Sequence, residues 1–217
     1  MIEIIFLTFF FLIFWTFTSN KFNQYDRKNR STYNSLLHSI IISFSTLINL
    51  SKNEINCYNI TYFKSYQTDI NLSLFLSYLI IDTTHLKKKD GISMYIHHIF
   101  LIVMLLVILL NKTYHFCFSI FLINEVSTIF LNLSYIIKKK SLSWLYIISK
   151  ILFVTSFYYI RIYQNYKVID IIFGCIKNND NIYYYSVSLL YMVYLYYLLN
   201  IYWSIIIFKK IINLFQK

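Results

Sequence analysis

Proline and alanine are absent from this 217-residue chain, and glycine occurs only twice. Charged residues make up 13% of the sequence, and only nine residues are acidic. Long apolar runs fill the chain instead, with 58% hydrophobic and 21% aromatic residues. A soluble globular domain is richer in small and charged residues than this. The composition therefore predicts a single all-helical integral membrane domain and excludes a soluble fold.

The net charge of +11 does not indicate a nucleic-acid-binding protein. A nucleic-acid interface gathers Lys and Arg on one surface, whereas here they fall in short clusters between apolar runs. In a membrane protein such clusters set the orientation of the chain. We therefore expect no nucleic-acid partner.

The apolar runs are close to the ~20 residues that a helix needs to cross a bilayer. Seven are found, at roughly 2–18, 33–50, 70–86, 95–110, 114–137, 144–163 and 182–208. A shorter stretch, Val168 to Ile176, is expected to lie in the membrane interface or to re-enter it. The first run could be a cleaved signal peptide, but its basic residues follow it rather than precede it. We expect it to remain as a span.

The basic residues between these runs alternate in number along the chain. Loops on one side of the membrane hold thirteen Lys and Arg residues, and those on the other side hold five. By the positive-inside rule the richer side faces the cytosol. This predicts a cytosolic C-terminus and an N-terminus on the opposite side.

The three cysteines do not form a predicted metal site, since no Cys/His spacing suits zinc. Cys117 lies inside the fifth run. Cys57 and Cys175 both fall on the predicted non-cytosolic side, where they could pair or remain free thiols.

Ionisable side chains are costly inside a bilayer and usually pair, line a cavity or act chemically. Several polar residues lie a few residues from the predicted cytosolic ends of their runs, about 4–8 Å deep at ~1.5 Å per residue. This layer contains His38, Asp82, His97, His98 and Asn132. Glu125 lies deeper, near the middle of the fifth run. The histidine pair above a buried acid predicts a functional site.

Glu125, Thr128 and Asn132 follow i, i+3, i+7 spacing and share one helix face, which Ser127 flanks. Because polar groups facing lipid would be unsatisfied, this face is expected to turn inwards. Taken singly, His38 and Asn132 also fit a role as interhelical hydrogen-bonding residues. His115 lies at the predicted non-cytosolic end of the fifth run and is expected to lie in the membrane interface.

Several blocks together resemble the TLC domain family. They are Leu36–Ser39, Tyr78–Asp82, Tyr95–His98 and Asn124–Asn132, and the last is most similar to the TLC domain-containing protein 4 branch. The resemblance covers about residues 30–210. Residues 1–29 are then a first transmembrane helix and cytosolic loop, and 211–217 a cytosolic tail.

The resemblance implies about seven spans, six of them forming a barrel around a lipid-sized cavity, in the endoplasmic reticulum membrane. His97 and His98 match the histidine pair that serves acyl transfer from acyl-CoA in the family's ceramide synthases, and Glu125 matches the first acid. Thr128 stands where the second acid is expected, and a basic residue expected further on is missing.

We therefore predict a role in lipid homeostasis or membrane lipid metabolism, with an acyl lipid in the cavity. The alternatives are an acyl-CoA-dependent N- or O-acyltransferase of the ceramide synthase type, and a trafficking protein or proton-coupled lipid carrier. No bound cofactor is expected, acyl-CoA is a possible co-substrate, and the expected partners are membrane lipids, a second copy or another membrane protein. The candidate catalytic residues are His97, His98, Glu125 and Asp82, and the candidate lipid-contacting residues are His38, Ser127, Thr128 and Asn132.

Overall fold

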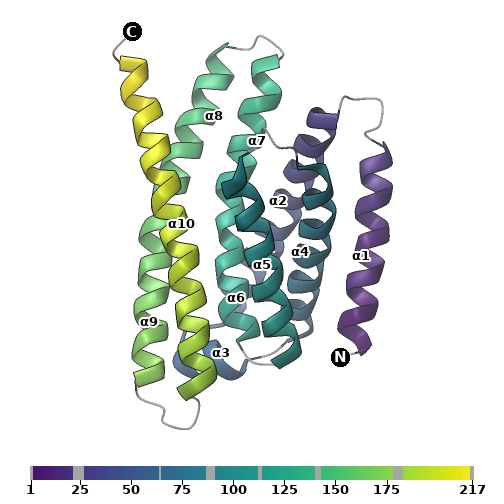
Figure 1. The fold of residues 1–217 in the computed structure, drawn as a ribbon, viewed down its shortest axis with the longest axis vertical. Helices are drawn as coiled ribbons and strands as arrows, with labels where there is room; N and C mark the ends of the chain where they lie inside the picture. The colour runs from purple at the N-terminus through teal and green to yellow at the C-terminus, as the bar shows by residue number, and fades with distance from the viewer. Residues whose placement is uncertain are drawn as a thin grey trace.

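The computed structural model describes residues 2–21, 27–63, 65–86, 91–111, 114–139, 143–177 and 183–215, and no strand occurs in these ranges. Long antiparallel helical rods run between two ends of the bundle (Figure 1). The upper end in Figure 1 holds the C-terminus, and the lower end holds the N-terminus. The all-helical fold predicted from composition is confirmed in the described residues.

The rods follow chain order. They are α1 (Ile2–Lys21), α2 (Arg27–Lys52), α4 (Tyr66–His85), α5 (Ile92–Asn111), α6–η3–α7 (His115–Phe121, Leu122–Asn124, Glu125–Lys139), α8–η4–α9 (Ser143–Ser156, Phe157–Gln164, Asn165–Lys177) and α10 (Tyr183–Phe215). The short α3 (Cys57–Tyr62) lies at the lower end (Figure 1). η3 is a 3-10 turn and η4 a π-helical segment, each continuous with its neighbours.

Local sequence sets where several helices begin. The Ser65 hydroxyl accepts from the backbone N–H of Thr68, and the Thr68 hydroxyl accepts from that of Ser65, which closes a capping box at the start of α4. The Asn56 side chain accepts from the Asn59 N–H and caps α3. Gly91, just before α5, has φ +88°, a conformation that glycine adopts without steric cost.

Five segments of the described chain are long and apolar enough to span a membrane. They are Glu3–Lys21, Ile92–Leu110, His115–Lys138, Trp144–Lys177 and Val187–Asn213. The predicted spans at 33–50 and 70–86 form α2 and α4, which are as long but more polar. Both helices carry polar side chains that are buried inside the bundle, such as Asn34 and Ser77. These polar residues lower the mean hydropathy of α2 and α4.

The stretch from Val168 to Ile176 does not form the interfacial or re-entrant segment that its length suggested. It belongs to α9, which continues η4 without a break, so Trp144–Lys177 is one candidate span of 34 residues. The polar residues Gln164, Asn165 and Lys167 divided one helix into two apolar runs in the sequence.

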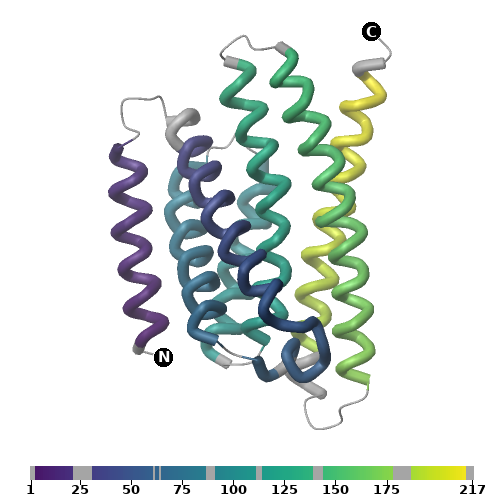
Figure 2. The backbone as a smooth tube through the Cα atoms, turned by 180° about the vertical axis from the view of Figure 1, so that it is seen from behind, coloured from purple at the N-terminus to yellow at the C-terminus, as the bar shows by residue number. Residues whose placement is uncertain are grey.

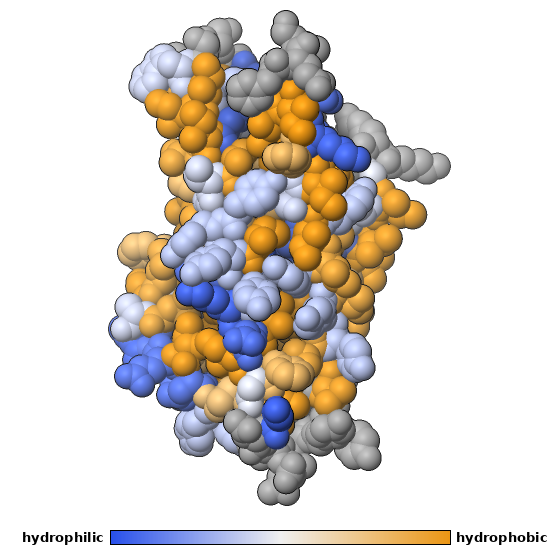
Figure 3. Space-filling model, turned by 90° about the vertical axis from the view of Figure 1, so that its left-hand side faces the viewer, coloured by the Kyte–Doolittle hydropathy of each residue, from blue (hydrophilic) through white to orange (hydrophobic). Residues whose placement is uncertain are grey.

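α2 lies at the centre of the packing and contacts α1, α4 and the α6–η3–α7 rod. Further contacts join α7 to α8 and α9 to α10, and Figure 2 shows the same arrangement from behind. Apolar side chains cover much of the face in Figure 3, and large ones such as Phe208 and Leu198 on α10 are more than half exposed. An apolar exterior of this kind is typical of a surface in contact with lipid.

A disulfide joins Cys57 of α3 to Cys175 of α9 at the lower end, and Cys117 is free and buried. The sequence had left this pairing open. Close by in the fold, the structure corrects the interfacial prediction for His115, which is fully buried. Its Nδ1 lies 2.6 Å from Oδ1 of Asp69 and its Nε2 lies 3.1 Å from the Ile108 carbonyl oxygen.

The Ile108 carbonyl can only accept a hydrogen bond, so Nε2 of His115 carries a hydrogen. The 2.6 Å contact with Asp69 needs a second hydrogen, on Nδ1 or on the carboxyl group. In either arrangement the pair shares one hydrogen in addition to the one on Nε2. The contacts of His115 with Asp69 and Ile108 join α4, α5 and α6 at the lower end of the bundle.

Candidate functional site

His98, near the start of α5, faces the last turns of α4. Its side chain is 4% exposed, and Nε2 lies 3.7 Å from Oδ2 of Asp82. Nδ1 lies 3.1 Å from Oγ1 of Thr83. The structure thus brings together two of the predicted catalytic residues, His98 and Asp82, at the upper level of the bundle.

The hydrogen bonds of Thr83 determine which nitrogen of His98 carries a hydrogen. The Thr83 hydroxyl has one hydrogen and donates it to the Leu79 carbonyl at 2.6 Å, so its oxygen can only accept from His98 Nδ1. Nε2 is then the nitrogen that can gain or lose a proton beside Asp82. Asp82 is itself held by Ser31, whose hydroxyl donates to Oδ1 at 3.0 Å.

His97 points to different neighbours. Its ring lies 5.7 Å from that of His98 between centroids, but it packs edge-on against Trp203 of α10 at 4.8 Å. The buried Nδ1 of His97 has no hydrogen-bond partner among the described residues. The two histidines occupy adjacent positions of α5. Among the described residues, no acidic side chain contacts both of them.

Glu125 begins α7 at the middle of the bundle, and its carboxylate is held from two sides. The Ser39 hydroxyl lies 3.1 Å from Oε2 and 2.7 Å from the Ser35 carbonyl oxygen, and shares its one hydrogen between these two acceptors. Nη2 of Arg161 lies 3.8 Å from Oε1. In the described part of the chain these contacts, rather than the histidines, are the polar partners of Glu125.

Arg161 is the functional candidate that the sequence analysis missed. It is 7% exposed and lies in the π-helical segment η4. Its Nε donates to the Ser127 hydroxyl at 2.8 Å, and Nη2 donates to the Thr128 hydroxyl at 2.9 Å and the Asn124 carbonyl at 3.1 Å. Nη1 reaches Oδ1 of Asn200 at 3.5 Å. A charged residue placed within an apolar run was the signal that could have indicated it.

A π-helical turn adds a residue to the helix and often marks a functional position. Here η4 turns Arg161 towards α7, while neighbouring Tyr159 and Tyr163 remain about half exposed. Because the guanidinium is planar and carries five N–H donors, it can bond several groups of the α7 face at once. Ser127 and Thr128, which were predicted to contact lipid, both accept hydrogen bonds from Arg161.

The remaining predicted residues lie on α2 and α7. Nδ2 of Asn132 donates to the Ser35 hydroxyl at 2.9 Å, which links the two helices. His38 is fully buried and its ring stacks on Tyr78 with centroids 3.8 Å apart. Both ring nitrogens of His38 lack hydrogen-bond partners among the described residues. Asn132 and His38 therefore sit between helices, outside the contacts of His98 and Glu125.

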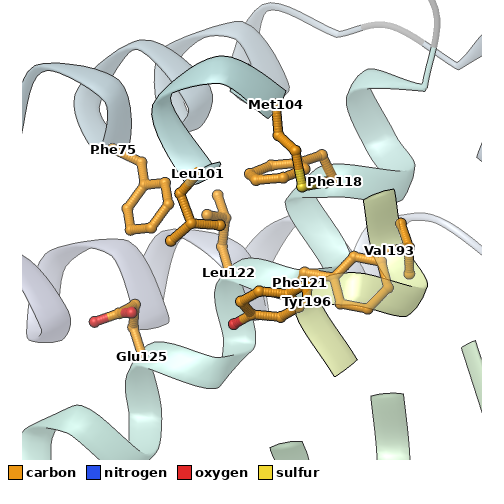
Figure 4. Close-up of a pocket in the computed structure, with 9 residues that line it drawn as sticks. All are labelled: Phe75, Leu101, Met104, Phe118, Phe121, Leu122, Glu125, Val193 and Tyr196. Atoms are coloured by element: carbon orange, nitrogen blue, oxygen red, sulfur yellow. The ribbon is translucent and has the colours of Figure 1, made fainter. Parts of the chain in front are cut away.

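A narrow slit with about 10 Å³ of free space, room for roughly one water molecule, extends from Glu125 between α4, α5, α6 and α10 (Figure 4). Apart from the Glu125 carboxylate and the Tyr196 hydroxyl, its walls are apolar. The lining residues are Phe75, Leu101, Met104, Phe118, Phe121, Leu122, Glu125, Val193 and Tyr196. The Tyr196 hydroxyl accepts a hydrogen bond from Nδ2 of Asn124 at 3.0 Å. The Glu125 carboxylate lies at one end of the otherwise apolar slit.

The sequence matches the TLC domain over residues 4–209. This chain belongs to the TLC domain family. The match covers nearly the whole chain and begins within α1. A comparison with curated proteins gave no match. The family and the apolar helices together indicate a multi-pass membrane protein.

Proposed function

We propose that this TLC domain protein binds the acyl chain of a membrane lipid in the slit and serves lipid homeostasis. One observation carries the proposal, namely an apolar slit that ends on a buried, paired carboxylate. Pockets that bind apolar ligands combine apolar walls with a few polar groups that fix the orientation of the ligand. The lipid head group would lie near Glu125 and its chain along Leu101 and Met104, and the side chains of the narrow slit would move apart to admit the chain.

The setting that we propose is the endoplasmic reticulum membrane, with the C-terminus in the cytosol. Lys21, Lys138 and Lys209 all lie towards the upper end, which also holds the C-terminus. The positive-inside rule places such an end in the cytosol. The block from Glu125 to Asn132 supports the TLC domain-containing protein 4 branch within the family.

A second candidate function is acyl transfer from acyl-CoA to an amine or hydroxyl of an acceptor lipid. Nε2 of His98 would take the acceptor proton as the new C–N or C–O bond forms, and would pass it to the departing CoA thiolate as the C–S bond breaks. Asp82, 3.7 Å from Nε2, would stabilise the imidazolium between these steps. The fixed hydrogen on Nδ1 favours this candidate, since it leaves Nε2 as the base.

Thr128 and Arg161 favour lipid binding over transfer. Where the ceramide synthases are expected to hold a second acid, Thr128 bonds to Arg161 instead. The same guanidinium lies beside Glu125, with Nη2 3.8 Å from Oε1. The paired carboxylate is then held in place, where it can orient a ligand.

Lipids that co-purify with the wild-type protein and with His98→Ala would test both candidates by mass spectrometry. His85→Ala is the matched control, because His85 lies in the last turn of α4 away from the slit. Labelled acyl-CoA and a mixed pool of acceptor lipids would then be added to each sample. A bound acyl lipid without a labelled product supports binding, and a product lost only in His98→Ala supports transfer. Absence of any enriched lipid or product in the wild type would reject both.

A further inference from the structure

One face of α2 carries a polar residue at every turn from the middle of the bundle to the lower end. We call this row the α2 seam; its members are Ser39, Ser43, Thr46 and Asn49 of α2, together with Asn53, which follows the last helical residue Lys52. Spacings of three and four residues keep them on one side of the helix. α2 contacts α7, η3 and α6. At 1.5 Å per residue, the seam is about 21 Å long.

Both ends of the α2 seam have defined contacts. At the upper end the Ser39 hydroxyl lies 3.1 Å from Oε2 of Glu125. At the lower end Nδ2 of Asn49 donates to the Ser119 hydroxyl at 3.3 Å, and Nδ2 of Asn53 donates to Oδ1 of Asn49 at 3.1 Å. Asn53 is partly exposed, so the seam connects the candidate site to the lower surface.

The middle of the α2 seam lacks such contacts. Ser43 is 3% exposed and Thr46 is fully buried, and neither hydroxyl has a hydrogen-bond partner among the described residues. Most helical Ser and Thr residues satisfy the hydroxyl by donating to a carbonyl one turn back, as Ser77 and Ser127 do here. Ser43 and Thr46 do not, so two polar groups remain unmatched in the interior.

A buried polar group without a partner costs about 1–3 kcal/mol, and buried water is the usual partner that supplies the missing hydrogen bond. A water molecule needs two to four polar neighbours. The α2 seam offers hydroxyls and amides one turn apart. The polar groups near the two ends of the seam already have hydrogen-bond partners in the protein. These groups lie about one helix pitch apart, so single waters can bridge them once the close packing around Ser43 and Thr46 opens to admit water.

We propose that the α2 seam holds a file of water molecules between Asn53 and Glu125. Through this file the Glu125 carboxylate exchanges water and protons with the lower side of the membrane. The slit borders Glu125 from the α4, α5 and α10 side, whereas the seam reaches it from α2. The proposal does not depend on whether the slit binds a lipid.

Accessibility of single cysteines to silver ions tests the proposal. Ser43→Cys and Thr46→Cys would be made in a Cys117→Ala background, in which the remaining cysteines form the disulfide. Silver ions are small and bind the thiolate, which forms readily only in contact with water. The protein in liposomes would be exposed to Ag⁺, then denatured and labelled with maleimide to count the thiols left free.

Ile42→Cys is the matched control for a dry interior position on the same helix, because Ile42 is fully buried and apolar. Leu47→Cys, at a position 51% exposed, reports a surface facing lipid. We expect Ag⁺ to block Ser43→Cys and Thr46→Cys at least ten times faster than Ile42→Cys. Equal rates at the seam and control positions would overturn the proposal.

Adding Asn49→Leu to Thr46→Cys tests the route of entry. Since Asn49 lies between Asn53 and Thr46, its replacement is expected to slow the Ag⁺ reaction at least tenfold. An unchanged rate would show that water does not enter from Asn53 and would reject the file as described.

Thr46→Val gives a second measurement that keeps the side-chain shape. In a dry seam the variant removes an unmatched hydroxyl and raises Tm. In a hydrated seam it removes a group that binds water, so we expect an unchanged or lower Tm. A higher Tm for Thr46→Val would contradict the proposal.

Discussion

Nη2 of Arg161 lies 3.8 Å from Oε1 of Glu125, and both residues are held within the membrane-spanning part of the bundle. The pair joins η4 to the first turn of α7. Because it is surrounded by Ser127, Thr128 and Asn200, the guanidinium is desolvated from water but not left without partners. The Arg161 guanidinium thus links its own rod to polar groups of the α6–η3–α7 rod and of α10.

Arg161→Gln should destabilise the protein strongly. The substitution leaves the Glu125 carboxylate without its counter-charge, and breaking a buried ion pair from one side costs about 3–5 kcal/mol. We expect a clear fall in Tm in detergent for Arg161→Gln. Lys150→Gln is the control, since Lys150 is an exposed cation of the same rod, and it should leave Tm nearly unchanged.

The double variant Arg161→Gln with Glu125→Gln separates charge from packing. If the cost comes from the unpaired carboxylate, neutralising Glu125 should recover part of the lost stability. A double variant that is no more stable than Arg161→Gln alone would mean that the bonds to Ser127 and Thr128, and not the ion pair, carry the effect.

The Cys57–Cys175 disulfide should stabilise the lower end. It closes a loop with a sequence separation of 118 residues, and disulfides of this kind typically contribute 2–4 kcal/mol. We expect Cys57→Ser to lower Tm, and peptide mapping without reduction to recover Cys57 linked to Cys175. Cys117, which is buried, should react with maleimide only after denaturation. Free Cys57 and Cys175 in native protein would contradict this prediction.

The sequence predicted most of the long helices because most apolar runs approach the ~20 residues of a membrane span and no proline interrupts them. It placed Asp82 and His98 at a similar depth, since the ends of neighbouring antiparallel helices lie at one level, but it did not distinguish this pair from His38, His97 and Asn132 in the same layer. It did not predict Arg161 as a site residue. The partners of Arg161 lie 33 to 39 residues away, and only tertiary packing brings them together.

The Asp69–His115 pair was missed for a similar reason. Asp69 lies just before the third apolar run, so it was counted with the loop, and His115 was placed at the interface. In the folded chain the two side chains approach to 2.6 Å with His115 fully buried. Depth along one helix cannot reveal such a partner, because it depends on how α4 and α6 are staggered.

Asp69→Asn should lower stability without changing the bound lipid. The substitution replaces one partner of the buried 2.6 Å contact, and removing one partner of a buried pair usually costs about 3–5 kcal/mol. We expect a fall in Tm together with an unchanged spectrum of co-purifying lipids, since Asp69 does not line the slit. A changed lipid spectrum in Asp69→Asn would indicate that the lower end also shapes the site.

Filling the slit should exclude the acyl chain. Met104 is 2% exposed and lines the slit, whereas Val103, the preceding residue of α5, is 47% exposed on the outer surface. Met104→Trp adds volume inside the slit, and Val103→Trp adds a similar volume towards lipid. We expect Met104→Trp to retain several-fold less acyl lipid than the wild type, or lipid with shorter chains, while Val103→Trp retains the wild-type amount. Quantitative lipid mass spectrometry on monodisperse protein provides the comparison. Equal retention in the two variants would place the lipid somewhere other than between Phe75, Leu101 and Met104.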